Sequence, residues 1–459
     1  MEGTVSDETH ATERRATFRE VFASVEYRAL YTATVLGWIG NYLAKVAVTA
    51  LVFQETRSVG WSAATFALSY LPWLAGGPFL AALAERYRYR EVMVICDLLQ
   101  MAFIAMVAVV PMPVEMIMVL LFLSSLAAPP AQAARSAVLP LVLTGDRLVM
   151  GLSLNLTTGQ AAQVLGYLTG GALSAINPRL ALVINAATFA TSAVLIRTGL
   201  RDRPPAMTAA HRSHLLRETG EGFHMVFSTR VLRAIAILVF TSMLFAIVPE
   251  GLAAGWAATL VQDASEQGLT QGMIMAANPI GYILGGLIVA RLVRPDVRRA
   301  MIRPFAVLAP LSLVPSLFAP GIVGIVVMAA VCGFAVAGMM PAMNAMFVQA
   351  LPNGYRARAF GVMQAGVQIM QGVAVLGTGL LADRYDLPTV VGLWSLAGVG
   401  LVLLAIIGWP TAQQFTDAVA AAEARNAAPA TADAAPAPAD SDGPGRERTS
   451  PADGVGATT

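Results

Sequence analysis

The sequence predicts an all-α membrane protein whose twelve transmembrane helices form two six-helix bundles. Composition is the first observation behind this fold class. Hydrophobic residues make up 56% of the chain and charged residues only 13%, whereas soluble domains carry about 25% charged residues. A surface this poor in charge requires lipid as its outer solvent. Twelve long apolar runs and the segregation of arginines between alternate connections are the other two observations.

Each apolar run is long enough to cross a bilayer, which takes about 20 mostly apolar residues. Lipid offers no partner to an unpaired backbone group, so every run must be helical. The predicted spans are residues 29–53, 61–84, 91–111, 115–138, 149–175, 179–199, 231–256, 269–293, 301–319, 321–350, 357–381 and 388–409. Turn signals such as PMP at 111–113 separate neighbouring spans.

The basic residues indicate the orientation of these spans. Almost all of the 30 lysines and arginines lie in the N-terminal tail, in alternate connections and in the C-terminal tail. Cytoplasmic loops of membrane proteins carry this excess. We therefore expect a multi-pass protein of the cell membrane with both termini in the cytoplasm. The first 28 residues are polar and charged, and we expect no cleavable signal peptide there.

Five segments follow from this pattern. Residues 1–28 form an N-terminal tail, 29–200 the first bundle and 231–410 the second. Residues 201–230 join the bundles, and the stretch HLLRETGEGFHMVF within them predicts an amphipathic helix on the inner leaflet. Residues 411–459 are rich in Ala, Pro and Asp, which predicts a disordered cytoplasmic tail.

Lys45, the sole lysine of the chain, stands inside the first apolar span. A cation in the membrane persists only where it faces protein or a wet cavity. Trp38, Asn41 and Lys45 recur at helical spacing and form one polar face, which we expect to point inward. Two interpretations of Lys45 are equally open. It is either a structural cation paired with one carboxylate, or a residue that acts in substrate binding or coupling.

Further polar side chains lie on single faces of other spans. Together with Trp38, Asn41 and Lys45 we expect them to line one water-accessible cavity, although buried amides also join membrane helices directly. These additional residues are Asn155, Gln163, Tyr167, Gln271, Asn278, Tyr282, Gln364, Gln368 and Gln371.

The two halves of the chain echo each other. AALAERYRYR at 81–90 follows span two, and GLIVARLVR at 286–294 follows span eight; duplicated halves are typical of secondary transporters. Residues 81–90 match the G-x-L-A-D-R-x-G-R-R loop signature of the major facilitator superfamily at four positions. GYLTGG at 166–171 matches the exporter signature G-P-x-x-G-G, with Tyr167 replacing the proline. Over residues 20–410 the chain thus resembles that superfamily, and within it the macrolide-efflux-like drug exporters of actinobacterial type.

The resemblance implies two sets of functional residues. Spans one and seven line the cavity in such proteins. Glu250 of span seven, which follows the helix-breaking Pro249, is therefore the candidate proton carrier. A proton on Glu250 would compete with the pairing of this carboxylate to Lys45. A place for Glu250 at the outer interface is the alternative. The implied cytoplasmic gate network comprises Glu85, Arg86, Arg90, Asp97, Arg135 and Arg291.

These features predict a secondary transporter that exports an amphipathic drug or natural product by proton antiport. An uptake permease or facilitator of the same fold and a non-transporting membrane sensor or assembly protein are the alternatives. The sequence contains no nucleotide-binding loop, metal cluster or nucleophile–base pair, so we expect neither an enzyme nor a cofactor. The expected partners are a small-molecule substrate, protons and membrane lipid, for a monomer with no nucleic-acid partner.

Overall fold

The structure, a computed structural model, describes residues 17–75, 87–203, 215–352 and 355–427, and regular structure within these ranges is helical. The first half contains α1 (Phe18–Val21), α2 (Val25–Thr56), α3 (Val59–Leu68), α4 (Leu71–Ala75), α6 (Tyr89–Val109), α7 (Val114–Leu126), α8 (Ala128–Val142), α9 (Asp146–Ile176) and α10 (Pro178–Gly199).

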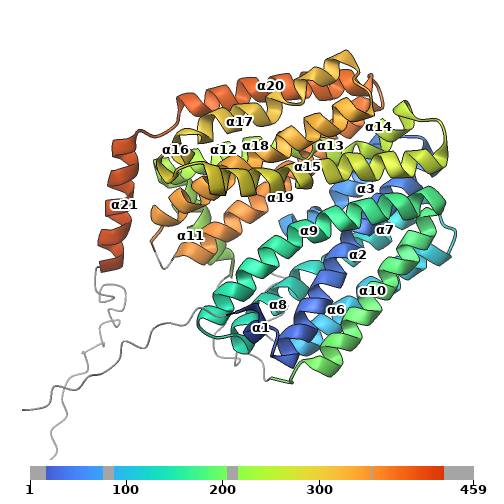
Figure 1. The fold of residues 1–459 in the computed structure, drawn as a ribbon, viewed down its shortest axis with the longest axis horizontal. Helices are drawn as coiled ribbons and strands as arrows, with labels where there is room; N and C mark the ends of the chain where they lie inside the picture. The colour runs from blue at the N-terminus through green and yellow to red at the C-terminus, as the bar shows by residue number, and fades with distance from the viewer. Residues whose placement is uncertain (1–16, 76–86, 204–214, 353–354, 428–459) are drawn as a thin grey trace, which may run out of the picture.

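The second half follows α11 (Leu215–Ser228), which lies in the connection between the halves. Its elements are α12 (Arg230–Ala246), α13 (Val248–Gly251), α14 (Ala253–Leu260), α15 (Ala264–Leu292), α16 (Pro295–Ala300), α17 (Ile302–Leu311), η1 (Val314–Phe318), α18 (Ile322–Gln349), α19 (Arg356–Ala382), α20 (Leu387–Ile407) and α21 (Ala412–Ala427). Figure 1 shows the two halves as adjacent helical bundles.

The predicted spans correspond to these helices. Nine helical segments of the described residues are long and apolar enough to cross a membrane. The fifth predicted span corresponds to the 31-residue α9. The ninth corresponds to a shorter apolar segment, Ile302–Phe318, which consists of α17 and η1. The second span begins in α3 and α4, and its remainder lies outside the described residues. The described residues therefore have the all-helical architecture that the sequence predicts, with helical structure at each of the twelve predicted spans.

Two segments outside the predicted spans are helical. α11 covers part of the segment in which the sequence predicts an amphipathic helix, and Arg358 of α19 forms a 2.6 Å ion pair with its Glu221. The prediction of disorder from residue 411 is wrong for α21, because Ala412–Ala427 is helical. Seven of these sixteen residues are alanine, the residue with the highest helix propensity, which favours the helix. Of the predicted tails at 1–28 and 411–459, residues 1–16 and 428–459 lie outside the described residues, while α1 and the start of α2 fall within the first.

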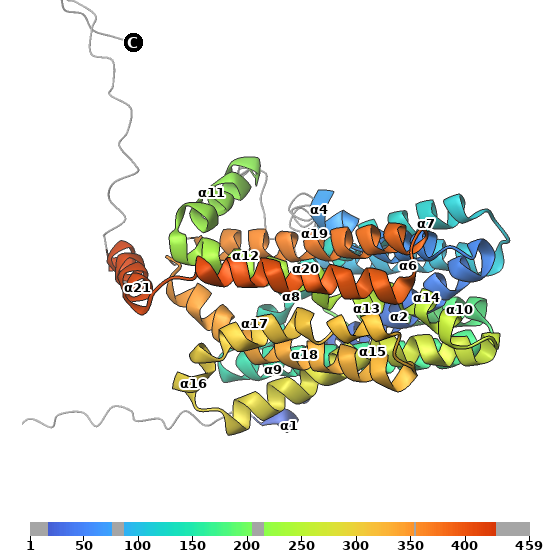
Figure 2. The ribbon, with the colours of Figure 1, turned by 90° about the horizontal axis from the view of Figure 1, so that it is seen from above.

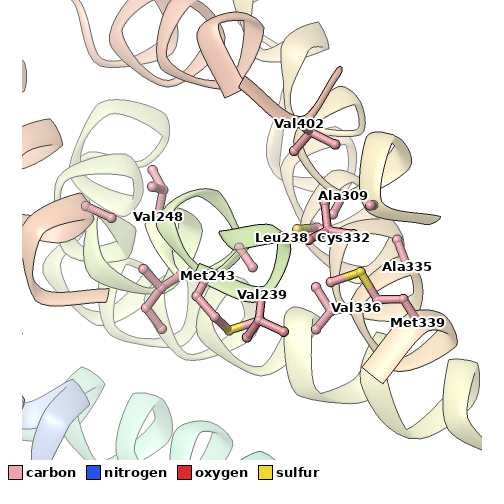
Figure 3. Close-up of a cluster of buried hydrophobic side chains, with 14 of the residues drawn as sticks. Leu238, Val239, Met243, Val248, Ala309, Cys332, Ala335, Val336, Met339 and Val402 are labelled. Atoms are coloured by element: carbon pink, nitrogen blue, oxygen red, sulfur yellow. The ribbon is translucent and has the colours of Figure 1, made fainter. Parts of the chain in front are cut away.

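The second half is held together by close packing of α15 against α18. The backbones approach so closely that a Cβ at Gly281 would lie 1.8 Å from the Ala330 carbonyl oxygen, and one at Gly333 would lie 2.0 Å from that of Asn278. Small residues at such crossings let membrane helices gain packing that lipid does not drive. An apolar cluster continues from this crossing to α12, where Val239 lies beside α18 (Figure 3).

The two halves touch at the ends of the helices that carry few basic residues. Gly171 of α9 meets Gly268 and Gly272 of α15, and a Cβ on any of the three would lie within 2.8 Å of the other helix's backbone. A Cβ at Gly60 of α3 would lie 2.3 Å from a carboxylate oxygen of Asp383, just after α19. Side chains therefore cannot be inserted at this end without separating the bundles.

Asp383, just after α19, joins the two halves at the same end of the bundles. Its carboxylate accepts hydrogen bonds from the Ser58 hydroxyl at 2.8 Å and from the Gly60 backbone N–H at 2.9 Å. Both donors belong to the start of α3, so the contact joins the C-terminal half to the N-terminal half. It satisfies an N–H of the first helical turn that has no partner inside the helix.

Replacing Asp383 with alanine is expected to loosen this end. Loss of both hydrogen bonds should raise the population with separated bundle ends roughly five- to a hundredfold. Distances between spin labels at Trp61 and Tyr385, both exposed at this end, measure the change. Asp386→Ala is the matched control, since Asp386 bonds only Thr389 within α20. An equal effect of both variants would contradict the role assigned to Asp383.

Candidate functional site

A cavity of about 450 Å³ lies between the two halves. Its N-terminal wall consists of α2, α9 and the turn before α4, which carries Tyr70. The opposite wall consists of α12, α13, α15, α18 and α19. Polar and ionisable side chains from both halves line it: Tyr42, Lys45, Tyr70, Gln160, Gln163, Tyr167, Glu250, Asn278, Tyr282, Gln364, Gln368 and Gln371. Such a concave, mixed surface is suited to a small molecule.

A second cavity, of about 270 Å³, extends into the N-terminal half. Lys45, Tyr42, Tyr70 and Gln368 line both cavities, so the two spaces share one boundary. Trp38 and Asn41, which the sequence places on the same helical face as Lys45, line this second cavity. The polar face formed by Trp38, Asn41 and Lys45 thus points inward.

Lys45 is surrounded by aromatic rings. Its ammonium nitrogen lies 5.0 Å from the ring centres of Phe66 and Tyr70 and 5.7 Å from that of Tyr42. Ring faces attract a cation, most strongly where water is excluded. Among the described residues no carboxylate oxygen lies within 4.0 Å of this nitrogen. The expected direct pair with Glu250 is therefore absent here, although the two groups interact electrostatically across the central cavity.

Glu250 is buried between the halves rather than at the outer interface, with 5% of its surface exposed. Pro249 occupies the first turn of α13, and the helix of the seventh span is interrupted between α12 and α14. Proline lacks the amide hydrogen that would continue the preceding helix. The break turns Glu250 toward α9, where the Tyr167 hydroxyl donates a 2.7 Å hydrogen bond to its carboxylate. Gln163 donates to the same tyrosine oxygen at 3.4 Å.

Two predicted cavity residues lie elsewhere. Gln271 is wrong as a cavity residue: it is 2% exposed, and its amide donates to the Val46 carbonyl at 3.1 Å and to the Thr49 hydroxyl at 2.7 Å. It joins α15 to α2, because a buried amide is stabilised by polar partners on the neighbouring helix. Asn155 lies on α9 outside both cavities described here.

Sequence reasoning missed the aromatic residues around Lys45 and several polar residues. Tyr42 stands three positions before Lys45, the spacing of neighbours on a helix face, and Gln160 has the same relation to Gln163. These two could have been found from periodicity. Asn185 of α10 is fully buried and lines the N-terminal cavity. It recurs with Thr188 and Ser192 at helical spacing, so periodicity could have found it as well.

The gate network is only partly assembled. Asp97 is fully buried and accepts from Arg135 at 3.1 Å and from the Ser192 hydroxyl at 2.6 Å. Arg90 instead pairs with Asp202 at 3.3 Å. Arg291 is exposed and forms no ion pair within the described part of the chain, so its place in the network stays a prediction. Glu85 and Arg86 lie outside the described residues.

Replacing Asp97 with asparagine is expected to destabilise the N-terminal half. The change leaves the Arg135 guanidinium, 11% exposed, without its carboxylate. Breaking a buried pair from one side costs about 3 kcal/mol, which should lower the melting temperature of the purified protein. Asp202→Asn is the control, because its partners Arg88 and Arg90 are partly exposed and such pairs contribute about 1 kcal/mol or less. Equal melting temperatures for the two variants would contradict the assignment.

Comparisons with known proteins point to one family. The family model of the Major Facilitator Superfamily matches residues 30–374 and 246–431. Macrolide efflux protein A of Streptococcus pyogenes is 22% identical over 399 residues, which cover 83% of this chain and 95% of that protein.

Solved structures share the fold. The nucleoside transporter NupG has a TM-score of 0.61 at 18% identity, over 83% of this chain and 98% of that one. A bacterial homologue of the human lysosomal transporter Spinster, in an inward-facing and occupied conformation, has a TM-score of 0.65 at 13% identity, over 88% and 98%. At these identities the likeness concerns the arrangement of helices.

Proposed function

Because this chain belongs to the Major Facilitator Superfamily, we propose that it exports an amphipathic small molecule across the cell membrane by proton antiport. It is a secondary transporter rather than an enzyme, and macrolide efflux protein A is the relative that supports export. The observation that carries the proposal is the cavity between the halves, where Lys45 and Glu250 face the same space. Apolar surface, aromatic rings and a few polar groups suit an amphipathic substrate.

The proposed coupling resides in Glu250. A carboxylate that accepts a hydrogen bond makes a stronger bond when it is ionised, so a proton on Glu250 weakens its link to Tyr167 of the other half. The same proton removes the negative charge that faces Lys45. Protonation of one side chain therefore changes both the contact between the halves and the charge of the substrate cavity. In this scheme proton and substrate compete for the cavity, and the balance between its inward-facing and outward-facing states follows the charge of Glu250.

The proposed orientation places both termini in the cytoplasm. The connections rich in arginine then lie on the inner side, as the positive-inside rule requires. The end fastened by Asp383 and by the contact of Gly171 with Gly272 becomes the outer end. With its outer end closed, the arrangement is inward-facing, and the transporter works as a monomer in lipid by rocking one half against the other.

Everted membrane vesicles test the function. Export from the cell should appear as uptake of a radiolabelled macrolide into vesicles that are energised by a proton gradient, and an uncoupler should abolish it. Accumulation in right-side-out cells that the same uncoupler abolishes would instead establish a permease. Absence of flux in either direction for a macrolide and for ethidium would contradict the proposal and favour a non-transporting role, which no comparison supports.

A further inference from the structure

A third cavity lies on the outside of the second half, between α12 and α20. These helices are packed side by side, with α11 and α21 at the same end (Figures 1 and 2). The crevice has a volume of about 550 Å³. It is lined by Arg230, Arg233, Ala234, Ile237, Thr241, Leu401, Leu404, Ala405 and Gly408, and shares no residue with the two cavities described above.

The polarity of this crevice changes along its length. Arg230 and Arg233 stand in the first turn of α12, where the helix begins. From there the lining continues to Thr241, roughly 16 Å deeper at 1.5 Å per residue. This depth is close to one leaflet of the hydrocarbon core, about half of 30 Å. A charged mouth therefore leads into an apolar groove as deep as one lipid tail.

The apolar part of the groove is uncovered. Ile237 is 42% exposed, Leu401 47% and Leu404 64%. All three lie within spans that cross the membrane, so the solvent that covers them is lipid. A groove with exposed aliphatic side chains on both walls holds an acyl chain without burying any polar group.

The charge at the mouth selects the headgroup. Arg230 and Arg233 are exposed, and among the described residues neither forms an ion pair. Arg233 donates one hydrogen bond to the Phe227 carbonyl at 3.1 Å, at the end of α11, which fixes its position beside the crevice. Guanidinium groups bind phosphate oxygens through paired hydrogen bonds. Two uncompensated cations at the level of the headgroups favour a lipid with net negative charge.

We propose that this crevice is a binding site for one anionic phospholipid, with its phosphate on Arg230 and Arg233 and one acyl chain between α12 and α20. The site is separate from the substrate cavity and lies on the arginine-rich side of the membrane. A lipid bound there also contacts the end of α11 through Arg233, and so joins the connection between the halves to the second bundle.

Native mass spectrometry of the full-length protein in detergent tests the proposal. Phosphatidylglycerol and phosphatidylcholine with identical acyl chains are titrated separately, and inorganic phosphate is the third ligand. We expect phosphatidylglycerol to bind on the order of tenfold more tightly than phosphatidylcholine, and R230Q/R233Q to abolish that preference. The control R294Q/R303Q removes two exposed arginines outside the crevice and should retain it.

The remaining outcomes decide the source and the place of binding. Ala234→Phe fills the groove and leaves both arginines, so it should weaken binding of phosphatidylglycerol severalfold. Equal binding of the two lipids, an unchanged preference in R230Q/R233Q, or an equal loss in the control would overturn the proposal. Displacement of the lipid by millimolar inorganic phosphate, or full binding by Ala234→Phe, would show a surface anion site instead and would also overturn it.

Discussion

Glu250→Gln is expected to abolish proton-driven transport in energised vesicles. Glutamine keeps the size of the side chain and can still accept a hydrogen bond from Tyr167, which lies 2.7 Å away in the wild type. It cannot exchange a proton in the working range of pH. Uptake that responds to the proton gradient should therefore fall by at least about tenfold, whereas binding of substrate persists. Removing a proton-transfer group commonly costs a hundredfold or more.

Two further variants separate coupling from folding. Glu266→Gln, in the exposed first turn of α15, removes a carboxylate outside both cavities and should leave transport unchanged. Tyr167→Phe removes the bond between the halves but keeps the carboxyl group, so we expect slower transport that still requires the gradient. Undiminished proton-driven transport by Glu250→Gln would refute the role of Glu250 outright.

Gly281→Val is expected to prevent assembly of the second bundle. Even a Cβ at this position would lie 1.8 Å from the Ala330 carbonyl oxygen of α18, and backbone cannot move aside as a flexible side chain can. A Cβ at Gly285, one turn later, would lie 2.6 Å from the Phe334 carbonyl oxygen. The crossing therefore follows a G-x-x-x-G pattern. Overpacking costs about 3 kcal/mol or more when helices must separate. The yield of monodisperse protein in size-exclusion chromatography and its melting temperature measure the loss.

Gly286→Val is the matched control on the same helix. A Cβ there has no atom within 4 Å outside the local backbone, so the variant adds the same side chain toward open space. We expect a yield and melting temperature close to those of the wild type. If Gly281→Val behaved like this control, the close approach of α15 and α18 would not be a feature of the folded protein.

Periodicity within single helices predicted much of the cavity. The row Gln364, Gln368 and Gln371 lines it as expected, because its helical spacing fixes one face of α19. Gln271 shows the limit of this reasoning. Its spacing relative to Asn278 is also helical, yet its partners are Val46 and Thr49 on α2. A stripe predicts that a face is polar, but only the neighbouring helix decides whether that face meets water or another backbone.

The sequence by itself determined that the chain spans the membrane repeatedly as helices, since apolar length and backbone hydrogen bonding are local properties in lipid. It also placed Lys45 on an inward face. Only the tertiary structure decided that aromatic rings surround this cation and that Tyr167 reaches Glu250, 83 positions away in the chain. Contacts between distant helices depend on how the two bundles pack, and no spacing along one helix encodes that distance.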